Sequence, residues 1–524
     1  MNQKIDVYGL RLKLAADRKS ETISEFETGT QLFQAKQYDK AIAHFEQCLE
    51  QFDQPFDDEP LSEQDLASKT DKTSIELISK ILVSRGLSLY NKNLSSTEPN
   101  KELFKKASND FSLVPKYYHM YKRLYFSEKG YEYLLYKDRE ALNLFVSCLK
   151  AYYLEGTCWR QSEKRTELRS GVERTVLCFT QAIFMALDLK NHMDIVVNVN
   201  SCKAVLDQLP QYYMNRGLCY NEMKSYSKAI TDFTSQLTEL SLISSLAADK
   251  KEQQRYMTYH NIALSHMAMD KFEEAISDFS NCLECSSNYS KLLTDDKQKK
   301  YQQEKSIESH YQRAIACHKF ITENVAECNS ATYRKVIEFK KLASSDFEQV
   351  LSVKPNNYQC RLNYAQMLLT LARNSESVGE SKNFYLEAIS QLRKCLELKP
   401  KEIKLHMYLA KSLTKTNQAS EDIIDVYKKI ILLTEQEKSN VISDKQLANI
   451  FFERAVFYNR NLNNVEGAIA DFTKCIALNN KFSDAYFNRG TLYYLKQKKF
   501  DLALDDFVRV VEINSRDVEA LFEM

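Results

Sequence analysis

Residues 217–237 read GLCYNEMKSYSKAITDFTSQL, and the spacing within this stretch decides the fold. Ala229, Phe233 and Gln236 are separated by four and three residues, which places them on one stripe of an α-helix. A glycine, Gly217, lies 12 residues before Ala229. Two helices approach closely only where neither carries a bulky side chain, and Phe233 then fills the groove beside the contact. The stretch therefore predicts two helices packed as a pair.

The pattern of the second helix recurs along the chain. It consists of a small residue, a gap of three, an aromatic or large apolar residue, and a small residue or Cys before Leu or Ile. Ten copies lie at 41–49, 107–115, 141–149, 175–183, 229–237, 275–283, 343–351, 388–396, 468–476 and 503–511, and a weaker copy lies at 423–431. This repetition indicates a stacked array of similar units.

The small and aromatic residues of these copies form a repeat signature. Its members are Gly29, Ala41, Phe45, Gly86, Ala107, Phe111, Gly217, Ala229, Phe233, Ala275, Phe279, Ala343, Phe347, Ala468, Phe472, Gly490, Ala503 and Phe507. In register, they resemble the tetratricopeptide repeat family, whose unit often ends in Pro, here Pro355 and Pro400. The resemblance covers roughly residues 22 to 515 and implies an all-α fold, a right-handed α-solenoid or superhelix of about 10–11 helix-turn-helix repeats with insertions. The chain has only 10 Gly and 7 Pro, which disfavours a sheet-rich fold with many turns.

The spacing of the copies predicts the domain organisation. We expect an N-terminal cap at 1–21, repeats 1–3 at 22–155 with an acidic loop near 53–73, an irregular fourth repeat and repeats 5–6 at 156–289, repeats 7–9 with insertions at 290–433, and repeats 10–11 with a C-terminal cap at 434–524. The acidic loop is interpreted as a solvated loop, with docking of a basic partner as the alternative. The stretch 240–266 contains no helix breaker, so we expect it to be helical.

Composition favours an intracellular protein that binds neither nucleic acid nor membranes. Lys plus Arg number 72 and Asp plus Glu 71, so the net charge of +1 gives no overall field to attract polyanions. The apolar run from Ala182 to Leu187 is far shorter than the roughly 20 residues that span a bilayer, and the N-terminus lacks the apolar core of a secretory signal. The 13 cysteines have no framework spacing, which predicts reduced thiols and a cytoplasmic location.

Five repeats combine an Arg directly before the small residue of the first helix with an Asp directly before the second-helix Phe. The arginines are Arg85, Arg216, Arg313, Arg454 and Arg489, and the aspartates are Asp110, Asp232, Asp346, Asp471 and Asp506. Their co-occurrence predicts an ion pair that joins the two helices of a repeat. If exposed to solvent, each pair contributes about 0.2–1 kcal/mol.

The sequence offers no pattern typical of an enzyme, a cofactor site or a metal site. Gly156 and Gly171 are the two glycines closest together in the sequence, so the chain has no glycine pattern of a phosphate-binding loop or a nucleophile elbow. Cys282 and Cys285 form one C-x-x-C without a second pair or a spaced His, which favours packing over zinc. We therefore expect a non-catalytic protein without cofactors or metals.

One binding mode of the resembled family is the carboxylate clamp of chaperone-binding members, which grips a terminal Asp with Lys, Asn and Arg side chains. Asn215 and Asn363 match the middle Asn, and Lys404 follows the second of these correctly. However, Tyr408 replaces the Arg of the third repeat, and the repeat after Asn215 offers Met257 where Lys is wanted. The clamp is incomplete, which disfavours a co-chaperone.

The leading hypothesis is a scaffold or adaptor within a larger assembly, binding segments or helices of partner proteins on its first helices. Candidate partner-binding residues are Tyr212, Tyr213, Tyr220, Tyr486, Tyr493, Tyr494 and Trp159. The alternatives are a regulatory array attached to an enzyme, for which the end of the chain would be a truncation, and a component of cilia, axonemes or intraflagellar transport. The sequence does not identify the partner proteins.

Overall fold

The computed structural model describes residues 16–52, 72–96, 100–125, 136, 138–163, 169–196, 199–326, 330–416, 420–437 and 442–514. Throughout these ranges the chain is helical or connects helices, and it contains no strand. It divides into two compact units, residues 1–299 and 300–524. The acidic loop predicted near 53–73 falls outside the described residues except for its last two, as do most of the predicted N-terminal cap and residues 515–524.

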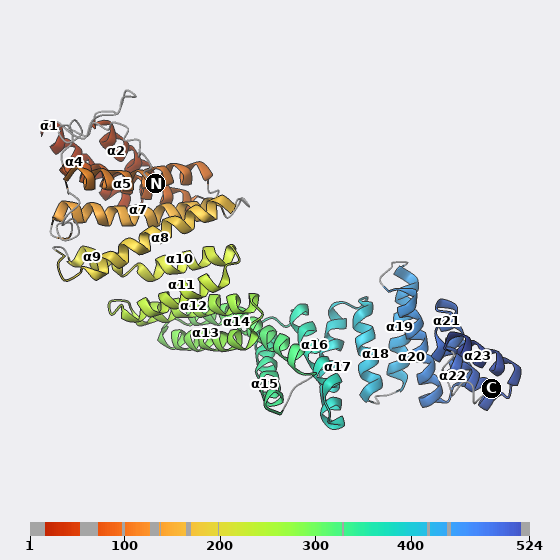
Figure 1. Ribbon diagram of the computed structural model, residues 1–524. Helices are drawn as coiled ribbons and strands as arrows, with labels where there is room; N and C mark the ends of the chain where they lie inside the picture. The colour runs from red at the N-terminus through yellow and green to blue at the C-terminus, as the bar shows by residue number, and fades with distance from the viewer. Residues whose placement is uncertain are drawn as a thin grey trace. The chain divides into compact units, whose positions relative to one another are not determined.

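The first unit is a stack of helical hairpins, followed from red to green in Figure 1. Its pairs are α1 (Ala16–Gln34) with α2 (Tyr38–Glu50), α4 (Lys72–Ser95) with α5 (Lys101–Tyr125), α7 (Arg139–Glu163) with α8 (Arg169–Asn191), α10 (Leu209–Glu222) with α11 (Tyr226–Leu242), and α12 (Ala248–Ala268) with α13 (Phe272–Leu292). The short helix α9 (Val199–Leu206) precedes α10.

The second unit continues the same pattern. Its pairs are α14 (Asp296–Asn324) with α15 (Ser330–Val353), α16 (Tyr358–Asn374) with α17 (Val378–Leu398), α18 (Ile403–Thr416) with α19 (Ser420–Glu437), α20 (Asp444–Leu462) with α21 (Val465–Leu478), and α22 (Ser483–Leu492), extended by the π-helical turn η1 (Tyr493–Gln497), with α23 (Phe500–Ile513). The described residues thus form ten hairpins in an all-α repeat array, as the sequence predicts.

Close contact between a glycine and an aromatic ring holds several of the hairpins together. All residues of the repeat signature are buried. A Cβ atom added at Gly217 would lie 2.6 Å from the ring of Phe233, and one at Gly29 would lie 2.7 Å from the ring of Phe45. In these hairpins the first helix therefore needs glycine where the ring of the second helix touches its backbone. Burial of each Phe stabilises the array by about 1.5–3 kcal/mol.

The tight turns of five hairpins share one backbone device. A residue one or two positions after the first helix has a positive φ in each, at Lys36, Lys224, Asp270, Asn463 and Lys498. In the α10–α11 turn, the next residue, Ser225, donates its backbone N–H to the carbonyl of Tyr220 at 2.8 Å. This closes the C-terminus of the first helix and reverses the chain.

Three predicted domain boundaries fall inside helices and are corrected by the structure. The boundaries after residues 155, 289 and 433 lie within α7, α13 and α19. The copy at 141–149, predicted to be a second helix, forms the first part of α7, which is the first helix of the α7–α8 hairpin. Its small residue is Gly156, whose added Cβ would lie 2.9 Å from the ring of Phe179 in α8.

The segment predicted to be helical over 240–266 is interrupted. Helix α11 ends at Leu242, Ile243 is extended, and α12 starts at Ala248. Ser245 donates its hydroxyl to the carboxylate of Asp207 at 2.9 Å. The break occurs without Gly or Pro, and this bond joins it to Asp207, which lies 38 residues earlier in the chain.

Candidate functional site: the first-helix surface of the second unit

The five predicted ion pairs are all present, and each joins the two helices of one hairpin through two hydrogen bonds. In the α10–α11 hairpin, Arg216 donates from Nε and Nη2 to the two carboxylate oxygens of Asp232 at 2.8 and 2.7 Å. The other four pairs have the same geometry, at distances of 2.6–2.9 Å. This planar match of guanidinium and carboxylate is the strongest form of such a pair.

These pairs are largely buried. The five aspartates are each less than 5% exposed. Burial raises the pKa of the Asp110 carboxyl, and its hydrogen bonds with Arg85 oppose that shift. The aspartates depend on their arginines because an unpaired buried charge is costly. The pairs therefore belong to the framework of the hairpins and are not a row of ligand-binding groups.

Aromatic side chains flank three of these arginines. The guanidinium of Arg216 lies 5.8 Å from the ring centres of both Tyr213 and Tyr220. Arg489 lies similarly between Tyr486 and Tyr493, at 5.8 and 5.9 Å. Each arginine thus gains cation–π contacts from residues three before and four after it on the same helix. These four tyrosines, predicted to bind partners, help to hold the ion pairs.

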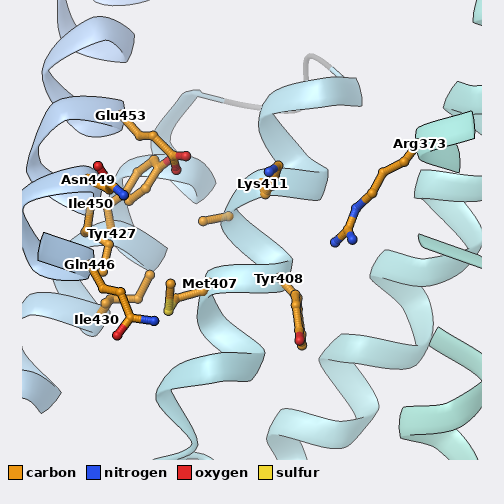
Figure 2. Close-up of a pocket in the computed structure, with 11 residues that line it drawn as sticks. Arg373, Met407, Tyr408, Lys411, Tyr427, Ile430, Gln446, Asn449, Ile450 and Glu453 are labelled. Carbon is orange, nitrogen blue, oxygen red and sulfur yellow. The ribbon is translucent and has the colours of Figure 1, made fainter. Parts of the chain in front are cut away.

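A pocket opens on the first helices of the second unit, and we call it the α18 pocket. It is lined by Arg373 of α16, by Met407, Tyr408, Ala410 and Lys411 of α18, by Tyr427 and Ile430 of α19, and by Gln446, Asn449, Ile450 and Glu453 of α20. Its volume is about 210 Å³. Figure 2 shows Arg373 reaching from its helix toward α18, with Glu453 and Asn449 on the opposite side.

The α18 pocket combines an apolar wall with a polar rim. Met407, Ile430 and Ile450 form part of the wall, and the two isoleucines are buried. On the rim, the hydroxyl of Tyr427 donates to the carboxylate of Glu453 at 3.2 Å. Asn449 and Lys411 are exposed. This arrangement can take up one apolar side chain and hydrogen-bond to the chain that carries it.

Exposed basic residues lie beside the pocket, and we call them the α18 stripe. Lys404, Lys411 and Lys415 are spaced by seven and four residues, so they lie on one face of α18 with Tyr408 between them. All three lysines are exposed, as is Arg373 on the neighbouring first helix. None of the four forms an ion pair with another described residue. The surface therefore presents positive charge that the array itself does not neutralise.

The repeat geometry agrees with the comparison with known families. The tetratricopeptide repeat family model matches residues 258–289 and 483–517, which fall in the α12–α13 and α22–α23 hairpins. The chain contains tetratricopeptide repeats. Proteins of this family generally bind other proteins. A comparison with curated proteins finds no match.

Several solved structures resemble this tetratricopeptide repeat protein at low identity. The C-terminal part of a TPR repeat-containing protein from Cytophaga hutchinsonii is 15% identical, with 59% of this chain and 97% of that chain covered and a TM-score of 0.34. Yeast Tom70 is 16% identical, with 97% and 94% covered and a TM-score of 0.25. The APC/C hetero-tetramer Cut9–Hcn1 is 14% identical, with 97% and 90% covered and a TM-score of 0.27. These likenesses are too distant to indicate what this protein binds.

The remaining predicted partner-binding residues of this tetratricopeptide repeat protein have different environments. Tyr212 is fully buried, which removes it from any partner surface. Tyr494 is 38% exposed and packs its ring edge-on against Phe500. Trp159 is half-buried in α7, a regular helix, with the guanidinium of Arg174 4.8 Å from its ring centre. Of the seven candidates, Tyr494 is the one classed as exposed.

The clamp-like asparagines are already engaged within the array. Asn215 donates to the hydroxyl of Tyr153 at 3.2 Å, and Asn363 donates to the hydroxyl of Tyr311 at 2.8 Å. In both cases the tyrosine comes from the first helix of the preceding hairpin. A terminal carboxylate would need these amides, and they are already bonded within the array. The clamp also lacks the Lys and Arg side chains at its other positions.

The cysteines serve as packing residues. Four of them, Cys48, Cys282, Cys395 and Cys475, follow the second-helix aromatic or its Leu equivalent, and Cys148 lies in the first helix α7; all five are buried. Burial raises the pKa of the Cys48 and Cys475 thiols to about 12. Over the described ranges no group of three or more His, Cys, Asp or Glu could hold a metal ion. No helix in the same ranges is both long and apolar enough to cross a membrane.

The α18 pocket and stripe were not predicted from the sequence as a binding surface. Lys404 and Tyr408 were interpreted only as clamp positions, and tyrosines were predicted as partner contacts. A sequence signal for the surface exists, because helices α16 and α18 contain five Lys or Arg and no Asp or Glu. The overall charge balance of the chain concealed this local excess.

Proposed function

We propose that this tetratricopeptide repeat protein is a non-catalytic scaffold or adaptor that holds segments of partner proteins within an intracellular assembly. The observation that carries the proposal is the α18 pocket, where side chains from three consecutive first helices leave an apolar wall and a polar rim facing solvent. Residues 358–374, 403–416 and 444–462 thereby provide one surface from separate repeats. An extended segment can cross such a surface and contact each helix in turn.

Two features support the intracellular and non-catalytic parts of the proposal. Every described cysteine is a buried thiol, as expected for a chain that folds under reducing conditions. The polar groups with internal partners, such as the five Arg–Asp pairs, hold helices together, and the buried thiols have raised pKa values unsuited to nucleophilic catalysis. We place the protein in the cytoplasm on these grounds.

Site-specific photocrosslinking in the native cell tests the proposal. A benzoyl-phenylalanine replaces Tyr408 at the pocket in one tagged variant and Leu432, exposed on the second helix α19, in a matched control. We expect the Tyr408 position to crosslink repeatedly to one segment of one partner protein, identified by mass spectrometry of the crosslinked peptide. Crosslinks that arise equally from Leu432, or that scatter over unrelated proteins, would contradict the proposal.

A further inference from the structure

The partner segment at the α18 pocket can be characterised by charge, an inference that rests on the proposed scaffold function. Helices α16 and α18 together carry Arg361, Arg373, Lys404, Lys411 and Lys415 and no acidic residue. The whole chain has a net charge of only +1. Positive charge is thus concentrated on two neighbouring first helices.

Most of this charge is available to a partner. Of the five basic residues, Arg361 is engaged, since it donates to the backbone carbonyl of Pro355 at 2.8 Å. The four residues of Arg373 and the α18 stripe are exposed and have no ion-pair partner among the described residues. On second helices of the same unit, by contrast, Lys340 pairs with Glu387 and Arg393 with Asp422. Because α17 and α19 also carry Asp or Glu residues, whereas α16 and α18 carry none, the uncompensated charge lies on these two first helices.

The pocket beside the stripe adds an apolar requirement. Its volume is about 210 Å³, whereas a protein cavity of about 150 Å³ is enough to accommodate benzene. Its wall includes Met407, Ile430 and Ile450. The amide of Asn449 on α20 is placed to hydrogen-bond a peptide backbone, because this side chain lines the pocket and is exposed, whereas the carbonyl oxygen of Gln446 already accepts from the backbone N–H of Ser443.

We propose that the α18 stripe and the α18 pocket together bind an acidic segment of a partner protein, in which Asp or Glu residues flank one large apolar side chain. The lysines and Arg373 pair with the carboxylates, and the apolar side chain enters the pocket. The apolar wall of the pocket offers nothing to a lipid headgroup or to a continuous phosphate backbone, so the surface favours a peptide over a nucleic acid or a membrane.

Fluorescence anisotropy with the full chain tests this binding. The probe is a fluorescein-labelled peptide of alternating Glu and Ser residues with one central Phe. We expect saturable binding that weakens as salt rises, because exposed charge pairs are screened. The double variant Lys411→Glu with Lys415→Glu should raise the dissociation constant by roughly tenfold or more. The control Lys429→Glu, exposed on the second helix α19, should leave it unchanged.

The pocket is tested through the peptide. Replacement of its Phe by Ala should weaken binding roughly tenfold to hundredfold, as expected for loss of a buried aromatic ring. The proposal is overturned if this replacement has no effect, if the lysine variants bind as well as the unmodified chain, or if a Lys and Ser peptide binds equally. It is also overturned if polyuridylic RNA or phosphatidylserine vesicles bind more tightly with the same dependence on Lys411 and Lys415.

The outcomes separate this inference from the scaffold function. A neutral or basic segment crosslinked at Tyr408 would leave the scaffold function intact and overturn the acidic partner. Binding of the acidic peptide without any reproducible crosslink in cells would support the chemistry of the surface and contradict the scaffold function.

Discussion

Arg216 and Asp232 form a two-point hydrogen-bonded pair across the α10–α11 hairpin, and Arg216 also donates from Nη1 to the hydroxyl of Thr180 on α8 at 3.2 Å. One side chain thus joins three helices from two adjacent hairpins. Arg489 repeats this arrangement with Asp506 and with Thr473 of the preceding second helix. The arginine therefore fixes both the hairpin and its contact with the preceding one.

Removal of Arg216 should destabilise its hairpin strongly. In Arg216→Met, Asp232 stays buried without a counter-charge, so we expect a loss of about 3–5 kcal/mol in local stability. Hydrogen exchange of the α10 and α11 amides measures this loss. The control is Arg393→Met, which breaks a pair with Asp422 whose two side chains are each half exposed and should cost less than about 1 kcal/mol.

A double variant distinguishes loss of the pair from loss of packing. Arg216→Met combined with Asp232→Leu removes both charges and should recover much of the stability lost in the single variant. If the double variant is instead as unstable as the sum of its two single variants, the guanidinium contributes through packing and the stranded charge is not the cause.

Gly217 should tolerate no side chain. In Gly217→Ala the new methyl group would lie 2.6 Å from the Phe233 ring, so we expect a loss of about 1–3 kcal/mol from forced repacking. Gly379 provides the control, because the nearest atom to an added Cβ there is 3.9 Å away. Gly379→Ala should keep or slightly raise stability. Thermal unfolding of the purified variants compares the two, and equal melting temperatures would contradict the close contact.

The sequence predicted the hairpins because their contacts depend on residue size at fixed helical spacing. Gly217 and Phe233 touch in the structure as their spacing implies, and Arg216 pairs with Asp232 through the positions directly before them. The α7–α8 hairpin was misjudged because Phe179 follows Gly156 by 23 residues, whereas compact repeats have 16. In lengthened helices the distance along the chain no longer reports which residues touch.

The partner surface was less predictable than the fold. Tyrosines on first helices look alike in sequence, yet Tyr212 is fully buried and Tyr220 packs against Arg216. Exposure depends on which face of a helix the next hairpin covers, and the spacing of the repeat signature does not specify that. Lys411 and Arg373 come from different repeats, so their shared surface exists only after stacking.

Lys224 occupies a turn that favours glycine. Its φ of 58° lies in the left-handed region, which costs a side-chain-bearing residue roughly 1 kcal/mol. Lys224→Gly should therefore raise stability by up to about 1 kcal/mol. The matched control is Lys228→Gly four residues later, inside α11, which should lower stability by about 1 kcal/mol. Urea unfolding checks both, and destabilisation by Lys224→Gly would show that the turn is not strained.

His318 should make the second unit sensitive to acid. Desolvation by burial lowers the pKa of this α14 side chain from 6.5 to about 4. Between these two pH values the unfolded chain binds a proton that the folded chain does not bind. Stability from this group is therefore complete above pH 6.5 and falls as the pH drops toward 4, by up to about 3 kcal/mol.

The comparison of wild type with His318→Gln isolates this effect from other acid-sensitive groups. Hydrogen exchange of the α14 amides at a series of pH values, corrected for intrinsic rates, gives the local stability of each protein. We expect the wild type to lose more stability than the variant as the pH falls from 6.5 to 4. The difference between their free energies of unfolding should change with the slope expected for one bound proton. A difference that stays constant across this range would mean that His318 titrates at its ordinary pKa in the folded chain.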